Sequence, residues 1–191
     1  MKAFNIYLTG VGGQGIGLLS EILLRAADHA GFPVKGVDTH GLAQRGGIVV
    51  SQIRIGSDVH SPLIRRGDAD LVVALERHEA FRGITAFLKD GGAVIYYDAV
   101  WQPLPVRLNQ ASEVDNDAIL AHCSERKIQV FRILKPGLTD ARMQNMAVLA
   151  GIHRNHLIPG IAFGHYQSAM SDLMEGDMLE KNMVLMNEVL S

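Results

Sequence analysis

Two short segments of this chain hold residues whose types and spacing are suited to binding chemistry. The first is a turn with glycines at G-x-G-x-x-G spacing, Gly10-Val11-Gly12-Gly13-Gln14-Gly15. The second is the polar, glycine-rich stretch from Thr39 to Gly47, which carries His40, Gln44 and Arg45. A glycine turn at a helix start gathers backbone N–H groups that favour an anion. An arginine binds a carboxylate or phosphate through two parallel hydrogen bonds.

Each segment also has a purely structural interpretation, in which its glycines serve a tight turn or close packing. For the first segment, we expect a possible anion site at the turn residues Gly10, Gly12, Gly13, Gln14 and Gly15. For the second, we expect His40, Gln44 and Arg45 to lie in an interface or binding loop, because loops beside sheet ends are where sites are built. No catalytic set and no metal site can be assembled from the sequence.

The elements around the glycine turn are those of a doubly wound α/β domain. An apolar run at 4–9 predicts a strand, and apolar residues spaced by three and four predict a helix over 16–30. Residues 34–38 predict a second strand, so that the unit reads strand, helix, strand. Asp38 then lies about 20 residues past the glycines, where a Rossmann fold places its ribose-binding acid.

The pattern departs from a dinucleotide-binding domain after Asp38. Residues 48–55 are rich in β-branched side chains and predict a strand. The nine residues before it are too few for a crossover helix. We therefore expect 48–55 to pair antiparallel or to lie at a sheet edge, with 4–9 central in the sheet.

The rest of the chain returns to alternating strands and helices. Strands are predicted at 70–75, 93–97 and 128–134, helices at 76–89 and 115–126, and a helical region over 139–191. The fold class is therefore α/β, Rossmann-like, with a mostly parallel sheet, flanking helices and a helical C-terminal region. The length of 191 residues suits one domain spanning 1–191.

Composition excludes several classes of protein. Hydrophobic residues make up 48%, charged residues 20%, and the net charge is −2, which gives no electrostatic attraction to nucleic acid. The single cysteine, Cys123, excludes an internal disulfide and a four-cysteine iron–sulfur cluster. No stretch approaches the ~20 apolar residues of a membrane span, and no signal peptide is visible. We expect a cytoplasmic location.

Other polar or aromatic residues have weaker interpretations. His153 and His156 have a helical spacing compatible with a metal, but no third ligand is evident, and a solvated helix end is the simpler interpretation. His78, beside Glu76 and Glu79, is interpreted as a solvated helix start. Arg65 and Arg66 suit an acidic partner surface or solvent, and Trp101 suits either an interface or loop packing.

Together, several segments resemble the gamma subunit or domain of 2-oxoacid:ferredoxin oxidoreductases, a family that acts on pyruvate, 2-oxoglutarate, 2-oxoisovalerate or indolepyruvate. The resemblance covers most of residues 4–150 and is most specific at Ala43-Gln44-Arg45-Gly46-Gly47. It is carried by the two segments above together with Val50-Ser51-Gln52-Ile53-Arg54-Ile55-Gly56, Ser61-Pro62-Leu63-Ile64, Asp68-Ala69-Asp70, Ala74-Leu75-Glu76 and Asn145.

The resemblance implies a subunit of an enzyme that oxidatively decarboxylates a 2-oxoacid and passes electrons to ferredoxin. In that family, thiamine diphosphate and iron–sulfur clusters belong to the alpha, beta and ferredoxin-like portions, and the acyl group passes to coenzyme A. The implied role of this chain is to pack on the thiamine diphosphate subunits near the coenzyme A path, with no cofactor of its own and no activity alone.

One alternative stays open, a free-standing NAD(P)- or other nucleotide-binding Rossmann-type protein that uses Gly10, Gly12, Gly15 and Asp38. The missing second crossover helix counts against it. The identity of the 2-oxoacid, the electron acceptor, the oligomeric state of the isolated chain and the coenzyme A contacts do not follow from the sequence.

Overall fold

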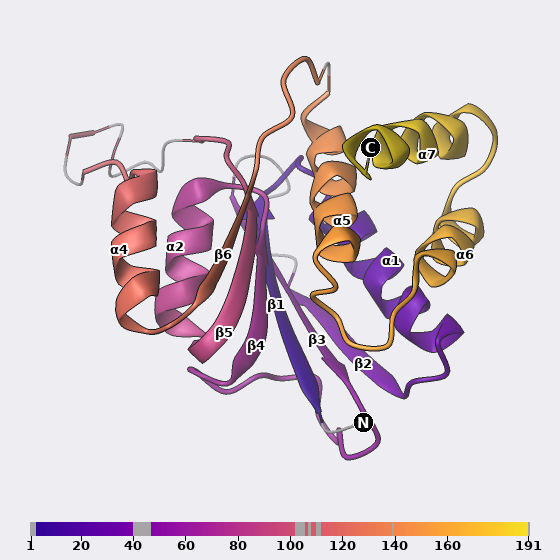
Figure 1. Cartoon of the computed structure of the whole chain (residues 1–191), viewed down its shortest axis with the longest axis horizontal. Coiled ribbons are helices and arrows are strands. Elements are labelled where there is room, and N and C mark those ends of the chain that lie inside the picture. The colour runs from indigo at the N-terminus through magenta and orange to yellow at the C-terminus, as the bar shows by residue number, and fades with distance from the viewer. Residues whose placement is uncertain are drawn as a thin grey trace.

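In a computed structural model of the chain, six strands form one mixed sheet with helices on both faces (Figure 1). The structure describes residues 3–39, 47–101, 106, 108–109, 112–138 and 140–190. The strands are β1 (Phe4–Val11), β2 (Val34–Thr39), β3 (Ile48–Ile55), β4 (Ala69–Ala74), β5 (Leu88–Tyr97) and β6 (Gln129–Ile133). The helices are α1 (Ile16–His29), α2 (Arg77–Ala86), α4 (Asn116–Glu125), the 3-10 turn η1 (Ala141–Met143), α5 (Gln144–Arg154), α6 (Phe163–Leu173) and α7 (Gly176–Leu190).

The strand order β2-β3-β1-β4-β5-β6 confirms the predicted fold class. β1 lies inside the sheet, parallel to β4 and antiparallel to β3, and β4, β5 and β6 continue the parallel part. β3 also pairs antiparallel with β2, so it separates the two parallel strands of the first βαβ unit. The expectation of an antiparallel strand after too short a connection is therefore confirmed.

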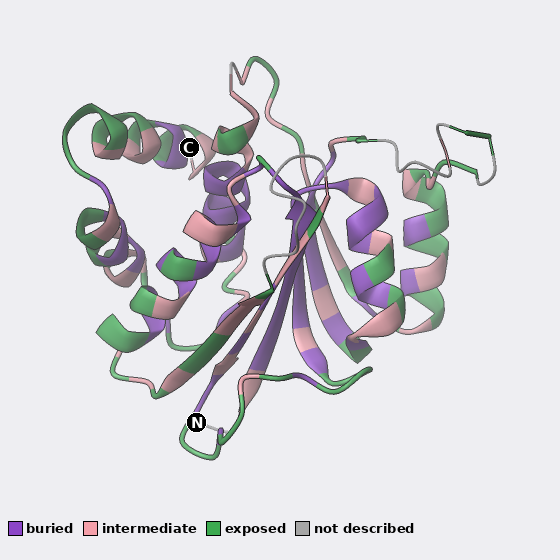
Figure 2. Ribbon diagram, turned by 180° about the vertical axis from the view of Figure 1, so that it is seen from behind, coloured by how far each residue is buried: buried purple, intermediate pink, exposed green. Residues whose placement is uncertain are grey.

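Two apolar cores lie on opposite faces of the sheet (Figures 1 and 2). Helices α1, α5, α6 and α7 cover one face, and α2 and α4 cover the other. β1 contributes side chains to both cores, because successive side chains of a strand point to opposite faces. Leu8 packs in the first core and Tyr7 in the second. Burial of each such side chain stabilises the fold by about 1.5–3 kcal/mol.

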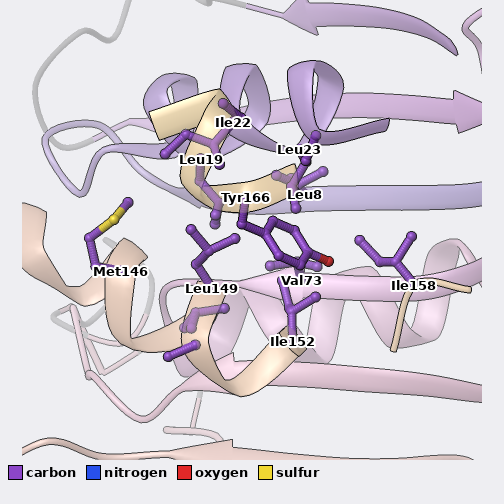
Figure 3. Close-up of a cluster of buried hydrophobic side chains, with 14 of the residues drawn as sticks. Leu8, Leu19, Ile22, Leu23, Val73, Met146, Leu149, Ile152, Ile158 and Tyr166 are labelled. Carbon is purple, nitrogen blue, oxygen red and sulfur yellow. The ribbon is translucent and has the colours of Figure 1, made fainter. Parts of the chain in front are cut away.

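The larger core joins the C-terminal helices to the sheet. Tyr166 of α6 is 1% exposed and lies among Leu8 of β1, Val73 of β4 and Leu149 and Ile152 of α5 (Figure 3). The predicted helical region after 139 thus packs on the sheet through its own apolar stripes. None of the helices within the described residues combines the length and apolar character needed to cross a membrane.

One boundary prediction is wrong. The helix expected over 76–89 ends at Ala86, and β5 begins at Leu88, five residues before the predicted strand start. Leu88 instead pairs with Ala69 of β4. The Arg126 guanidinium donates to the carbonyl oxygens of Ile84, within α2, and of Leu88, in β5, so contacts from far along the chain span the change from helix to strand.

Candidate functional site

The glycine turn lies between the end of β1 and the start of α1, at the carboxyl end of the parallel strands. Its backbone donors are partly engaged: the Gly12 N–H donates to the Gly47 carbonyl at 2.8 Å, and the Gln14 N–H donates to the Val11 carbonyl at 3.2 Å. The anion site predicted at Gly10, Gly12, Gly13, Gln14 and Gly15 stays a prediction.

The side chain of Gln14 forms three hydrogen bonds that link separate elements, a structural role that the sequence did not predict. It is fully buried, and its Oε1 accepts a hydrogen bond from the Val11 N–H at 2.8 Å. Its Nε2 donates to the Leu75 carbonyl at 2.6 Å and to Gln144 Oε1 at 3.0 Å. One amide therefore joins the glycine turn to the end of β4 and to the start of α5.

Gly15 and Asn145 make a second link between the turn and α5. Gly15 adopts the left-handed conformation with φ +82°, and a Cβ there would lie 2.6 Å from Asn145 Nδ2. Asn145 is 2% exposed, and its Nδ2 donates to the Gly15 carbonyl at 3.2 Å. Glycine is thus required at position 15 both for its backbone conformation and for the approach of this amide.

We predict that Gly15→Ala lowers the free energy of unfolding by about 2–3 kcal/mol, because a side chain there adds backbone strain and a clash. Denaturant unfolding of the single variants and of the Gly15→Ala/Asn145→Ala pair separates the two causes. Removing Asn145 relieves the clash but not the strain, so the combined loss should be smaller than the sum of the single losses. Strict additivity would contradict this reading of the contact.

The second predicted segment is described only at its ends. His40, Gln44 and Arg45 lie outside the described residues, so their predicted role stays a prediction. Its first residue, Thr39, pairs with Val50 of β3, which in turn pairs with Thr9 of β1. Its last residue, Gly47, accepts the hydrogen bond from the Gly12 N–H. The Gly47 end of the segment therefore lies beside the glycine turn, whereas its Thr39 end lies on β2, two strands from β1.

Asp38 does not lie next to β1 as a Rossmann ribose-binding acid would. β3 separates its strand from β1, which places it two strand spacings, about 10 Å, from the strand that leads into the glycine turn. Its Oδ1 accepts a hydrogen bond from the Ser20 hydroxyl of α1 at 3.0 Å. The carboxylate therefore ties β2 to α1.

The interpretation of Glu76, His78 and Glu79 as a solvated helix start is wrong, because these side chains are buried although α2 does start there. Glu76 caps α2 by accepting from the Glu79 N–H at 2.9 Å, and its Oε1 lies 2.8 Å from His78 Nδ1. His78 Nε2 accepts from the Val114 N–H at 3.2 Å, so Nδ1 is the ring nitrogen that carries the proton toward Glu76.

Glu79 occupies the same buried region against the end of β1. Burial raises the pKa of its carboxyl, while the Arg82 guanidinium at 3.3 Å and the Thr9 hydroxyl at 3.1 Å oppose that shift. The network also reaches the following loop, since the Trp101 N–H donates to Glu76 Oε1 at 3.1 Å. The network thus links the start of α2 to the end of β1 and to the loop after β5, which indicates a positioning role for the strand ends.

Asp98, directly after β5, has a buried carboxylate that accepts hydrogen bonds from α2, α4 and β6. Arg77 of α2 donates to its Oδ1 at 2.7 Å, and Arg132 of β6 and Asn116 of α4 donate to its Oδ2 at 2.6 and 3.1 Å. Burial raises the pKa of this carboxyl, but the three donors outweigh burial and hold the pKa below its ordinary value of 3.8.

The remaining candidates do not assemble into a catalytic or metal site. The rings of His153 and His156 are 6.0 Å apart, and burial lowers the pKa of His153. Within the described residues, no group of three or more histidine, cysteine or acidic side chains is placed to hold a metal. Arg65 and Arg66 are exposed, and Trp101 is 43% exposed.

Comparison with known proteins gives these features a context. The family model described as pyruvate ferredoxin/flavodoxin oxidoreductase matches residues 5–191. A curated protein of Archaeoglobus fulgidus, indolepyruvate oxidoreductase subunit IorB, is 35% identical over 190 residues, covering 94% of this chain and 90% of its own length. The subunit of the same name from Thermococcus kodakarensis is 39% identical over 112 residues, which are 59% of this chain and 55% of that protein.

Solved structures share the fold. The gamma subunit of a keto/oxoacid ferredoxin oxidoreductase from Geobacter sulfurreducens superposes with a TM-score of 0.67 at 18% identity, covering 98% of this chain and 96% of that one. A 2-oxoglutarate:ferredoxin oxidoreductase chain from Magnetococcus marinus has the same TM-score at 20% identity, and this chain covers 30% of its length. The family resemblance drawn from the sequence is thereby confirmed, and the chain belongs to the pyruvate ferredoxin/flavodoxin oxidoreductase family.

Proposed function

We propose that this chain is the gamma subunit of a multi-subunit 2-oxoacid:ferredoxin oxidoreductase and forms one gamma-type domain over residues 1–191. The match of the family model over residues 5–191 carries this proposal. It is supported by the fold shared with a gamma subunit of the same class of enzyme. The complex is an oxidoreductase that oxidatively decarboxylates a 2-oxoacid, with ferredoxin as the electron acceptor, in the cytoplasm.

The cofactors of such a complex belong, on this proposal, to the alpha, beta and ferredoxin-like subunits. Thiamine diphosphate supplies carbanion stabilisation, and iron–sulfur clusters carry single electrons. The chain's own residues fit neither a cluster nor thiolate chemistry, because its single cysteine, Cys123, is buried on α4 and burial raises the pKa of that thiol to about 11. The contribution of this chain is to position the partner subunits.

We place the contact with those subunits at the carboxyl end of the sheet. The segment that carries His40, Gln44 and Arg45 starts from the carboxyl end of β2, and its Gly47 end lies beside the glycine turn. Gln14 and Asn145 fix the turn to β4 and α5, so a partner that packs on this end meets a rigid base. The side of the complex through which coenzyme A reaches the thiamine diphosphate subunits is proposed to border this loop.

The proposal predicts that the purified single chain does not reduce viologen in the presence of pyruvate, 2-oxoglutarate or indolepyruvate, since it lacks both the carbanion-stabilising cofactor and the electron sink. Tagged chain from the native host should bring down larger, cluster-bearing subunits and then support the reaction. Substrate-dependent reduction by the single chain, or its isolation without partners at native abundance, would contradict the proposal.

A second prediction concerns Arg45. If its guanidinium contacts a partner subunit or a bound anion, Arg45→Ala should reduce turnover of the reconstituted complex about 30-fold, which corresponds to about 2 kcal/mol of a charge-assisted contact. Thermal unfolding of the free chain should stay within about 0.5 kcal/mol of wild type. The exposed Arg65→Ala variant serves as the matched control for loss of a surface arginine. Unchanged turnover of the reconstituted complex would show that Arg45 makes no contact on which the reaction depends.

The nucleotide-binding alternative is less well supported. Gly12 and Gln14 have backbone donors engaged within the chain, and Asp38 lies two strands from β1 with Ser20 as its partner. Isothermal titration of the purified chain with NAD(H) and NADP(H) distinguishes the two functions, because a Rossmann dehydrogenase binds its cofactor without other subunits.

A further inference from the structure

Asp90-Gly91 is the one Asp-Gly pair in the sequence, which contains no Asn-Gly pair. At an Asp-Gly pair the backbone nitrogen of the glycine can attack the carboxyl carbon of the aspartate and close a five-membered succinimide ring. Glycine favours this reaction because it has no side chain that hinders the approach of the two groups. The pair is therefore the position at which isomerisation of this backbone is chemically easiest.

The isomerisation releases one water molecule, takes one up again and needs no oxidant. A bond forms between the Gly91 nitrogen and Asp90 Cγ, and the bond from Cγ to one carboxyl oxygen breaks. That oxygen leaves as water, with the carboxyl proton and the Gly91 amide proton. A second water molecule then opens the ring. Opening at Cγ restores aspartate, whereas opening at the main-chain carbonyl carbon leaves isoaspartate, in which the backbone runs through Cβ and Cγ.

The pair lies in an exposed bulge of the parallel sheet. The pairing of β4 with β5 shifts register between Ala69 and Leu71, so residues 89–92 bulge out of the ladder. The Asp90 side chain is 80% exposed. Gly91 has φ +71°, and no atom lies within 4 Å of the position that a Cβ would occupy. Packing around Gly91 therefore does not restrain the reaction, and a restraint has to come from hydrogen bonds.

Arg126, the residue directly after α4, engages both reacting groups. Its Nε donates to Asp90 Oδ1 at 2.7 Å, and its carbonyl oxygen accepts from the Gly91 N–H at 2.9 Å. The guanidinium is itself fixed, because it also donates to the carbonyl oxygens of Ile84 and Leu88. Ring closure requires the nitrogen to give up its proton and to meet the carboxyl carbon in a near-attack geometry. Each hydrogen bond to Arg126 opposes that step.

The ion pair between Asp90 and Arg126 contributes little to the stability of the fold, because the acid is mostly exposed and solvent screens the pair. It nevertheless engages the carboxylate in its ionised form. That form reacts more slowly with the nitrogen, since the departing oxygen has to carry a proton in order to leave as water. The contact therefore affects the reactivity of the Asp-Gly pair more than the stability of the fold.

We propose that Asp90-Gly91 is a site of spontaneous isoaspartate formation and that Arg126 is the residue that restrains it. Isoaspartate lengthens the backbone by one carbon just before Gly92, which is closely packed. A Cβ on Gly92 would lie 2.9 Å from Leu88 Cδ1 and 3.0 Å from the Asp70 carbonyl oxygen. The modification therefore disturbs the pairing of β4 with β5. It concerns the chemistry of the backbone and is independent of the proposed function.

Incubation of the purified full-length chain at neutral pH and physiological temperature tests the site. Mass spectrometry of the peptide that contains position 90, with fragmentation that separates isoaspartate from aspartate, measures the product. We expect Arg126→Gln to accumulate it about tenfold faster than wild type, the rate change that corresponds to the loss of one hydrogen bond to a charged group. Adding Asp90→Glu should abolish the product, because glutamate would have to close a six-membered ring. Equal rates in wild type and Arg126→Gln would overturn the proposal.

Asp98→Ala separates the effect of Arg126 from a general loss of stability. This substitution removes the hydrogen bonds at the other end of β5 and leaves those of Arg126 in place. Isoaspartate at position 90 should then form at the wild-type rate, with folding of each variant checked by circular dichroism. If Asp98→Ala accelerates the reaction as much as Arg126→Gln does, the rate follows the stability of the fold, and Arg126 is not the restraint.

Discussion

Replacing Gln14 with alanine should lower the free energy of unfolding by about 4 kcal/mol, the largest effect we expect from any polar substitution in this chain. The truncation leaves the Val11 N–H and the Leu75 carbonyl without their partners, and each unsatisfied buried group costs about 1–3 kcal/mol. It also opens a void in a region that is fully buried. Chemical denaturation monitored by circular dichroism measures the loss.

The matched control is Gln144→Ala, which removes one of the three hydrogen bonds of Gln14 from a half-buried position. We expect a loss of about 1 kcal/mol or less, since water can replace Gln144. If the two variants lose the same free energy of unfolding, the hydrogen bonds of Gln14 to the backbone do not contribute the stability that we assign to them.

Asp98→Ala should lower the free energy of unfolding by about 3 kcal/mol, because two guanidinium groups lose the buried carboxylate that neutralises them. In addition, α2, α4 and β6 lose the hydrogen-bond acceptor that they share. Asp90→Asn is the appropriate comparison. Asp90 pairs with Arg126 at 2.7 Å, but its side chain is 80% exposed, so its removal should change stability by no more than about 0.5 kcal/mol.

Because the pKa of Asp98 is lowered, the stability lost in Asp98→Ala should depend on pH. A carboxyl whose pKa is lower in the folded chain stabilises it fully above the ordinary value of 3.8, and that contribution is lost as the pH falls through the folded-state value. The stability difference between wild type and Asp98→Ala should therefore be constant near neutral pH and narrow below 3.8. A difference that grows on acidification would show that Asp98 is not ionised in the folded chain.

The sheet was predictable because its signals are local. The run Phe4-Ile6-Leu8 gives residues 4–9 an apolar face, and the short stretch before Ile48 leaves no room for a crossover helix. The start of β5 was not predictable, since Leu88 pairs with Ala69 and accepts a hydrogen bond from Arg126, 38 residues away, and neither contact is local in the sequence. Boundaries that depend on such distant contacts leave no periodic pattern.

The glycine turn was predictable in place but its contacts were not, and the anion site at the turn stays a prediction. Glycine spacing identifies the turn, yet the engagement of Gln14 with residues 61 and 130 positions away follows only from the packed structure. Charged residues are rarely buried, so Glu76 and Glu79 read as solvent-exposed. The Trp101 N–H donates to Glu76 and the Thr9 hydroxyl donates to Glu79, and neither distant donor carries a sequence signature.

The position of β2 has a consequence for handling this subunit alone. β2 forms one edge of the sheet, so its outer row of N–H and C=O groups is a template onto which a strand from another molecule can pair. Lys35 and Gly36, both exposed on this strand, oppose such pairing by charge and by low strand propensity. Overexpressed chain in which Lys35 is replaced by valine should aggregate at a lower concentration than wild type, as light scattering would detect.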